Sequence, residues 1–354
     1  MTRIVAAIAI TLALAAPAAA DTVAQRTPAV GPALAGDLVA WGEEAPNGAT
    51  RVVVGAPGRE PLLAYRIRPA TAHRTERGFR HTSAAFAASA TRFAAVASTA
   101  TVTHAEFDHV SIAVTNAAVG GPFRGPPDLL SGAIPRRGDG PCRSELQHPQ
   151  AVDVDGDNIA VGDFATACGS DAPWQDRVVV SGPGIQATLQ TGTGGDMRDV
   201  ALAGHYLGWI HSDDRDEVVV RNLETGDTAL RLTDRDLRAT HIDELALQDD
   251  GTVAISYGDL NGQRLGWAAP GLPGVRLLDR RMGSRGLALA AGRVLYERGA
   301  GELMLRPLTG GPERRLARFR SGRGRIGDLD LDATRATWAT RGARGPGRIV
   351  VRAL

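Results

Sequence analysis

The stretch that decides the fold is Asp199-Val-Ala-Leu-Ala-Gly204-His-Tyr-Leu-Gly-Trp209-Ile210, in which two alternating apolar runs flank a turn. It is followed by Glu217-Val-Val-Val-Arg-Asn-Leu-Glu-Thr-Gly226 and then by Asp227-Thr-Ala-Leu-Arg-Leu232. Alternation of period two, rich in β-branched and aromatic residues and interrupted at Gly, predicts β-strands rather than helices. These runs predict four short strands. A sheet so small must stack on neighbouring copies to bury its faces.

The same pattern returns seven times along the chain. Consecutive copies are 41 to 66 residues apart, close to the length of a four-stranded propeller blade. We therefore predict an all-β fold, a seven-bladed β-propeller. The longest gap leaves six or eight blades as alternatives. The copies align on the turn between their first two strands, at Gly36, Ala90, Gly156, Gly204, Gly251, Gly292 and Ala333.

An aromatic residue recurs about five positions after this turn. Trp41, Trp209 and Trp338 lie at that position, and Tyr257 and Tyr296 lie within one residue of it. Because each aromatic ring falls in the middle of a predicted strand, we expect these side chains to pack between blades. A platform for stacking a ligand would instead gather them at one rim.

The two ends of the chain complement each other. The last copy stops after its third strand, at residues 349–352. The segment 21–27 resembles the fourth-strand segment 227–233. We predict that residues 21–27 complete the last blade and close the ring, which removes two exposed sheet edges.

The N-terminus has the features of a secretory signal. Arg3 precedes an apolar run over residues 4–16, and Ala18-x-Ala20 forms a cleavage motif before Asp21. The run is too short to span a membrane. We therefore expect residues 1–20 to be removed and residues 21–354 to form a single secreted, extracellular domain with no membrane span.

The charge of the chain is balanced. It carries 40 basic and 39 acidic residues, and removal of Arg3 makes the two numbers equal. A neutral domain gives no electrostatic reason to expect nucleic acid as a partner. All the basic residues apart from histidine are arginines, in a chain rich in Ala, Gly and Pro, so a local arginine cluster carries less weight than usual.

Two insertions interrupt the repeat, at residues 66–81 and 119–149. Insertions in a regular scaffold are where binding residues concentrate. One hypothesis is a ligand rim for an acidic partner; the alternative is a solvated loop of an arginine-rich sequence. The candidate rim residues are Arg74, Arg77, Arg80, Arg136 and Arg137.

The chain contains two cysteines, Cys142 and Cys168. In an exported protein a single pair favours a disulfide over a metal or redox site. We predict that the two form a disulfide between the insertion before the third copy and a loop within that copy.

The acidic stretch from Asp153 to Asp157 is the strongest metal-binding candidate. Asp153, Asp155 and Asp157 alternate around a turn, like the oxygen ligands that begin a calcium loop. Asp-Gly is also a common turn dipeptide, and no Glu completes an EF-hand loop. Calcium is thus the one cofactor considered, and otherwise we expect none. Acidic residues on the other innermost strands either line the channel for a cation or satisfy backbone donors: Asp199, Glu244, Asp328, Asp330 and Asp332.

The sequence contains no linear catalytic signature. It lacks a G-x-S-x-G elbow, an H-E-x-x-H motif, a P-loop and a dinucleotide fingerprint. The eight histidines are scattered without metal-ligand spacing. We therefore assign no catalytic residue.

The chain resembles the TolB-type or WD40-like propeller group. The resemblance rests on Asp250-Gly-Thr-Val-Ala-Ile255, on residues 204–209 and on residues 217–226. A second resemblance, to FG-GAP propellers, rests on residues 155–162 and 52–58. Some FG-GAP repeats bind calcium, which implies the three aspartates of the 153–157 stretch as ligands.

We expect a secreted, monomeric, non-catalytic propeller that binds a protein or a cell-envelope ligand. One alternative is an extracellular hydrolase or lyase, which needs ionisable groups that converge at one end of the channel. Another is a calcium-stabilised adhesion module.

Overall fold

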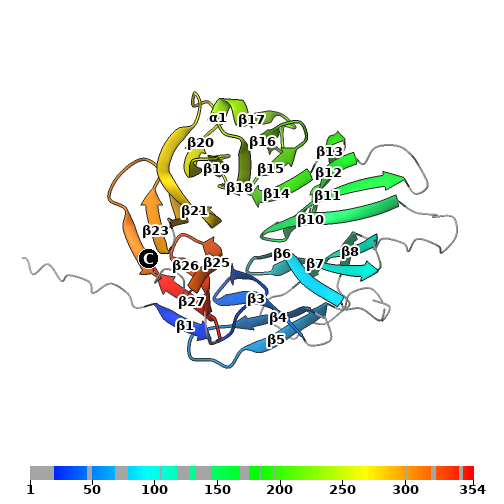
Figure 1. Ribbon diagram of the computed structural model, residues 1–354, viewed down its shortest axis with the longest axis vertical. Helices are drawn as coiled ribbons and strands as arrows, with labels where there is room; N and C mark the ends of the chain where they lie inside the picture. Colours follow the sequence, from blue (N-terminus) through cyan, green and yellow to red (C-terminus); the bar gives the residue numbers. More distant parts are fainter. Residues whose placement is uncertain are drawn as a thin grey trace, which may run out of the picture.

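The structure is a computed structural model. It describes residues 20–45, 50–67, 79–103, 106–117, 128–131, 145–167, 175–183, 185–193, 196–299, 301–319, 324–342 and 346–354. Figure 1 shows small twisted sheets set around a central axis, with the two ends of the described chain side by side. The all-β propeller prediction is confirmed.

Four sheets of four strands each follow the order of the chain. Their strands are antiparallel to their neighbours. The first two sheets are β2 (Val30–Ala35), β3 (Leu38–Glu44), β4 (Thr50–Gly55) and β5 (Leu62–Ile67), then β6 (Phe79–Ala88), β7 (Arg92–Thr103), β8 (Glu106–Ala117) and β9 (Asp128–Ser131). The next two are β10 (Glu145–Asp155), β11 (Asn158–Ala167), β12 (Gln175–Gly182) and β13 (Ile185–Thr193), then β14 (Asp196–Ala203), β15 (Tyr206–Ser212), β16 (Asp216–Asn222) and β17 (Thr228–Thr233).

A seven-stranded sheet follows, and a one-turn helix, α1 (Asp234–Leu237), leads into it. Thr233 caps this helix by accepting the Asp236 backbone N–H. The strands are β18 (His241–Leu247), β19 (Val253–Asp259), β20 (Gly262–Ala268), β21 (Arg276–Ala290), β22 (Arg293–Arg298), β23 (Glu302–Pro307) and β24 (Arg314–Arg318).

The last sheet joins the two ends of the chain. It contains β25 (Gly324–Leu331), β26 (Arg335–Gly342), β27 (Arg348–Ala353) and β1 (Asp21–Ala24). Strand β1 pairs with β27, with Asp21 opposite Val351 and Thr22 opposite Val350. The segment that was predicted as a fourth strand therefore pairs with the third strand of the last copy.

The seven-stranded sheet differs from the regular repeat because one strand is continuous where the sequence predicted two. Residues 276–282 of β21 pair with β20, and residues 282–290 pair with β22. The outer strand of one copy thus runs directly into the inner strand of the next. The sequence has no insertion here to interrupt the hydrogen-bonded backbone.

The turns that align the copies have the conformation their glycines imply. Gly36, Gly156, Gly204, Gly251 and Gly292 have φ between 55° and 80°. A side chain with a Cβ atom is strained in this region, and glycine is not. The turns place the first two strands of each copy in register.

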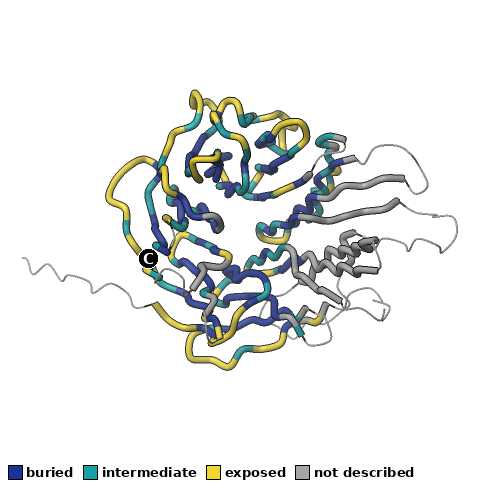
Figure 2. The backbone as a smooth tube through the Cα atoms, in the orientation of Figure 1, coloured by how far each residue is buried: buried dark blue, intermediate teal, exposed yellow. Residues whose placement is uncertain are grey.

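The core lies between the sheets. Within the described part of the chain, buried apolar side chains form seven clusters, and each cluster combines two neighbouring sheets or the two halves of the seven-stranded sheet. Figure 2 shows this burial along the inner and middle strands, with exposed residues at the turns and outer strands.

The repeated aromatic residues belong to these clusters. Trp41, Tyr296 and Trp338 are at most 2% exposed, and Trp209 and Tyr257 are 6% and 5% exposed. Four of them pack against the preceding sheet around the ring, and Tyr296 packs against the first half of its own seven-stranded sheet, which confirms that they are core residues. None of the described helices has the length and apolar character needed to cross a membrane.

Candidate functional site

The innermost strands surround a channel of about 690 Å³ along the axis of the ring. Alanine side chains, including Ala33, Ala87 and Ala246, make up much of its wall. Small side chains keep the passage open. The charged residues of its described wall come from the innermost strands: Asp153, Asp155, Arg198, Asp199, Asp243, Glu244, Asp328 and Asp330.

Carboxylates in the channel wall bind the backbone of the next sheet. The Leu202 N–H donates to Asp153 Oδ2 at 2.7 Å, and the Gly204 N–H donates to Asp155 Oδ2 at 2.7 Å. Both bonds span 49 residues, so β10 and β14 run parallel, with their first residues at the same end of the channel.

The same type of bond recurs around the ring. The Leu245 N–H donates to Asp199 Oδ2 at 2.9 Å, which links β14 to β18. The Gly286 N–H donates to a Glu244 carboxylate oxygen at 2.9 Å, which links β18 to β21. When the carboxyl group is ionised, a bond of this kind is stronger than one between neutral groups.

Two of these bonds join the last sheet to the first. The Gly31 N–H donates to Asp328 Oδ2 and the Leu34 N–H donates to Asp330 Oδ2, both at 2.6 Å. The residues are nearly 300 positions apart in the sequence. Arg335 on β26 also donates to the Gly36 carbonyl at 2.5 Å. Strands β25 and β2 are thus neighbours around the channel.

The second carboxylate oxygen of three of these aspartates is also occupied. Asp153, Asp199 and Asp330 each accept the N–H of the following residue through Oδ1, at 2.8, 2.9 and 2.7 Å. The channel aspartates therefore satisfy backbone donors, which is one of the two roles that the sequence left open for them.

Burial raises the pKa values of these carboxyl groups. The pKa is raised to about 7 for Asp153 and Asp199, to about 8 for Glu244 and to about 6 for Asp330. In each case loss of water contributes most, and the backbone hydrogen bonds oppose it. Near neutral pH this part of the wall is therefore less negative than its acidic residues suggest.

The three aspartates proposed as calcium ligands point to different partners. Asp153 and Asp155 accept the backbone N–H groups of Leu202 and Gly204, and Asp157 Oδ1 lies 3.5 Å from Arg92 Nε. Among the described residues, no group of three His, Cys, Asp or Glu side chains is arranged to hold a metal ion. Calcium at this position stays an alternative to the backbone-binding role of these aspartates.

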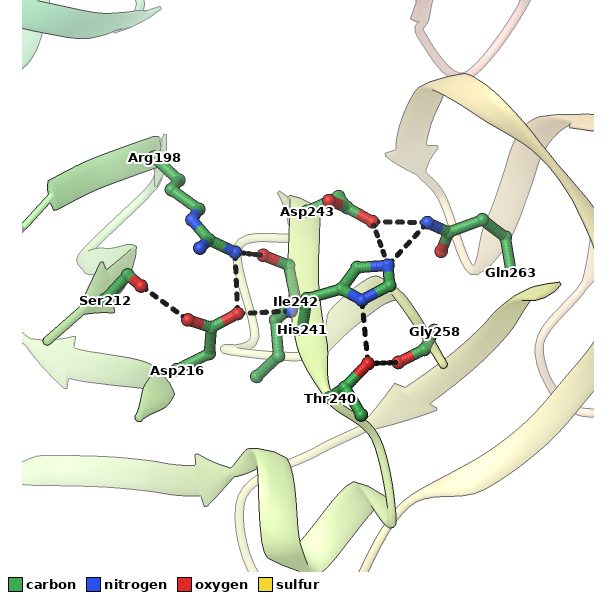
Figure 3. Close-up of polar contacts among 9 residues, drawn as sticks. All are labelled: Arg198, Ser212, Asp216, Thr240, His241, Ile242, Asp243, Gly258 and Gln263. Atoms are coloured by element: carbon green, nitrogen blue, oxygen red, sulfur yellow. Dashed lines mark hydrogen bonds and ion pairs between the residues drawn. The ribbon is translucent and has the colours of Figure 1, made fainter. Parts of the chain in front are cut away.

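A polar cluster lies where β14 and β18 begin, and we call it the mouth cluster: Arg198, Asp216, His241, Asp243 and Gln263 (Figure 3). In its first half, Arg198 Nη1 donates to Asp216 Oδ2 at 2.6 Å and to the Ile242 carbonyl at 3.1 Å. The Ile242 N–H donates to the same Asp216 oxygen at 2.6 Å. These bonds fasten one sheet to the next.

The second half of the mouth cluster lies beside it. Gln263 Nε2 donates to Asp243 Oδ2 at 2.6 Å and lies 2.9 Å from His241 Nε2. His241 Nε2 is 3.3 Å from Asp243 Oδ2, and its Nδ1 is 3.1 Å from Thr240 Oγ1. Hydroxyl, imidazole and carboxylate thus follow one another, as in a nucleophile triad.

This arrangement does not face the channel. The Thr240 hydroxyl also lies 3.3 Å from the Gly258 carbonyl, and its single proton serves only one of its two acceptors at a time. Arg198 and Asp243 line the channel, whereas Thr240 and His241 are not among the residues of its wall. The charged residues of the mouth cluster that line the channel are therefore Arg198 and Asp243.

Many of the residues that the sequence singled out lie outside the described part of the chain. These are Arg74, Arg77, Arg136 and Arg137 of the candidate rim, the cysteines Cys142 and Cys168, and nearly all of the signal segment. Arg80 lies on β6, but its side chain is not described. The mouth cluster was not predicted from the sequence, because its members come from four separate strands and form no local motif.

The chain is similar to known proteins in its structure and not in its sequence. No protein-family model matches the sequence, and no curated protein matches it. The structure is similar to the Cps50 (Swd1) β-propeller domain of Myceliophteria thermophila, with 11% identity, a TM-score of 0.53, and 94% of this chain and 98% of that chain covered.

Two further structures show the same likeness. One is YCF48 bound to D1 peptide, with 13% identity, a TM-score of 0.52, and 96% of this chain and 97% of that chain covered. The other is from an analysis of two prolyl endopeptidases, with 13% identity and a TM-score of 0.55, and it covers 91% of this chain but 46% of that one. At these identities the comparison shows a WD40-like propeller fold and no activity.

Proposed function

We propose that this protein is a secreted, monomeric and non-catalytic propeller that binds a protein or cell-envelope ligand at the mouth of its channel. The observation that carries the proposal is the mouth itself, where Arg198 and Asp243 line a channel of about 690 Å³. Concave sites of this size, with a few fixed polar groups that set orientation, are where proteins commonly take ligands.

The scaffold is inferred to be a closed ring of seven blades. Seven core clusters, one between each pair of neighbours, support this number. Support for closure by β1 comes from its pairing with β27 and from the bonds of Asp328 and Asp330 to β2. A ring of this kind holds the mouth residues in place at little cost in entropy on binding.

The positions of the two insertions in the sequence support the same mouth of the channel as the binding face. Segments 66–81 and 119–149 lead into β6 and β10. Gly31 lies against Phe86 and Gly36 lies against Ala90, so β6 runs parallel to β2. The innermost strands therefore begin at one mouth, which is the mouth that carries Arg198. We propose that the two insertions extend the binding surface there.

A protein or peptide ligand is favoured over a small substrate by one comparison. YCF48, whose length matches that of this chain, binds a peptide. We infer the same class of ligand here from the shared ring and the open mouth. Residues 1–20 support export, and N-terminal sequencing of protein recovered from the culture medium should begin at Asp21. Recovery of uncleaved protein from the cytoplasm would contradict export.

The binding proposal is tested by selecting phage-displayed peptides on the immobilised mature protein. Peptides should be enriched on the natural protein and should lose binding to Asp243→Arg, which reverses a charge at the mouth. Arg231→Gln is the matched control, because Arg231 pairs with Glu217 on the outer strands and lies away from the channel. Peptides that bind both variants equally well, or no enrichment at all, would refute peptide binding at the mouth.

A further inference from the structure

Arg198 is the one arginine in the described channel wall, and one edge of its guanidinium is free. Nη1 makes both of its hydrogen bonds, to Asp216 and to the Ile242 carbonyl. No described residue accepts from Nε or Nη2. The side chain is 32% exposed, so this second edge is open to a ligand while the first is fixed.

The fixed edge is held rigidly. Asp216 is 5% exposed and accepts from the Ser212 hydroxyl, the Ile242 N–H and Arg198, each at 2.6 Å. Because both of its oxygens are engaged, Asp216 holds the guanidinium in one orientation. Figure 3 shows Arg198 extending from β14 over this carboxylate, with Asp243 on the neighbouring strand.

We propose that Arg198 anchors a carboxylate-binding subsite at the channel mouth, which takes an acidic side chain or the C-terminal carboxylate of a peptide. This inference rests on the proposed binding function and specifies its ligand. The Nε and Nη2 groups of an arginine form a planar fork that matches the two oxygens of a carboxylate.

The surroundings tolerate a second carboxylate. Their raised pKa values, about 7 for Asp199 and about 8 for Glu244, keep both carboxyl groups partly protonated near neutral pH, which reduces their repulsion of an anion. Asp243 directs Oδ2 toward Gln263 and His241 rather than toward Arg198. The negative charge of Asp216 is already matched by the Arg198 charge, but the free edge still offers two N–H donors.

The test uses nuclear magnetic resonance of the mature protein labelled with nitrogen-15 in its arginines. The probes are the capped peptide acetyl-Ala-Ala-Asp-Ala-Ala-amide, its Asn counterpart, and acetyl-Ala-Ala-Ala with a free C-terminal carboxylate. Arg198→Gln identifies the Nε–H signal of Arg198 by its disappearance. We expect this signal to shift and saturate with the Asp peptide, the free-carboxylate peptide or both, and to stay unchanged with the Asn peptide. The two carboxylate probes distinguish a side chain from a C-terminus as the source.

Two variants separate recognition from folding. Arg198→Lys keeps a positive charge near Asp216 but loses the fork, and it should weaken probe binding by about tenfold or more. Arg231→Lys is the matched control and should bind like the natural protein. An unchanged affinity in Arg198→Lys, an equal response to the Asn peptide, or no saturable shift with any probe would overturn the subsite.

These outcomes are separable from those of the binding proposal. Peptides selected by phage display that need no carboxylate would leave the scaffold function standing and remove the subsite. A carboxylate response at Arg198 without any selected peptide would keep the subsite and contradict a peptide-binding scaffold.

Discussion

The substitution Asp199→Asn tests the account of the channel carboxylates. Asp199 accepts the backbone N–H groups of Val200 and Leu245, both at 2.9 Å, and its pKa is raised from 3.8 to about 7 by burial. Asparagine keeps the shape and one acceptor oxygen but never ionises. The variant therefore removes the cost of ionisation and one of the two hydrogen bonds.

The sign of the pH effect follows from proton binding. Between the ordinary pKa and the raised pKa, the folded protein holds a proton at Asp199 that the unfolded chain has released. The free energy of unfolding therefore falls as the pH rises through this range. A pKa raised from 3.8 to about 7 corresponds to at most about 4 kcal/mol for this group. Asp153, Glu244 and Asp330 add contributions of the same sign.

The measurement is urea unfolding at about pH 5 and about pH 8. Groups with lowered pKa values, such as Asp279, stay ionised throughout this range and do not contribute to the difference. We expect the natural protein to be more stable at the lower pH. In Asp199→Asn the difference between the two conditions should shrink by about 2 to 4 kcal/mol, while the lost hydrogen bond costs about 1 kcal/mol at both.

Asp213→Asn is the control, since Asp213 is exposed on the loop between β15 and β16. It should leave the pH dependence unchanged. Equal stability of the natural protein in the two conditions, or an unchanged difference in Asp199→Asn, would refute the claim that the buried wall disfavours the ionised carboxyl.

Three further predictions concern the ring. Deletion of residues 21–27 removes β1 and should lower the thermal unfolding midpoint by several degrees in calorimetry; an unchanged midpoint would contradict closure by this strand. Trp41→Ala should cost about 3 to 5 kcal/mol in urea unfolding, because Trp41 is fully buried against Ile349 and Val351 of the last sheet; a cost below about 1 kcal/mol would mean that this contact is not part of the core. A chelator should leave the midpoint unchanged, because Asp153 and Asp155 already bind backbone N–H groups, and a clear drop would instead support the calcium-stabilised module.

The strands, turns and core could be predicted from the sequence because they depend on residues close together along the chain. Alternation sets which side chains face the core, and glycine sets where the chain reverses. Trp41 and Trp338 were recognised as core residues for the same reason, since their position in the repeat is regular. The continuous strand β21 was not predicted, because nothing in the local pattern distinguishes a short turn from an unbroken strand.

Only part of the candidate site could be predicted from the sequence. The sequence placed Asp199 and Glu244 on innermost strands, but it left open whether they line the channel and hold a cation or satisfy backbone donors. The structure decides this, since each carboxylate lies beside an N–H of the next inner strand. Arg198 was not singled out, because its partners Asp216 and Ile242 lie 18 and 44 residues further along the chain.

The sequence by itself determined a repeated four-stranded unit, its turns and the aromatic residues that pack between copies. Only the tertiary structure decided how neighbouring inner strands align around the channel. That alignment determines which carboxylates accept a backbone N–H and which edge of the Arg198 guanidinium stays free. The physical reason is that packing between copies requires only apolar volume at a repeated position, which a sequence pattern records. A hydrogen bond between copies also requires the register and curvature of the whole ring, and no local pattern records those.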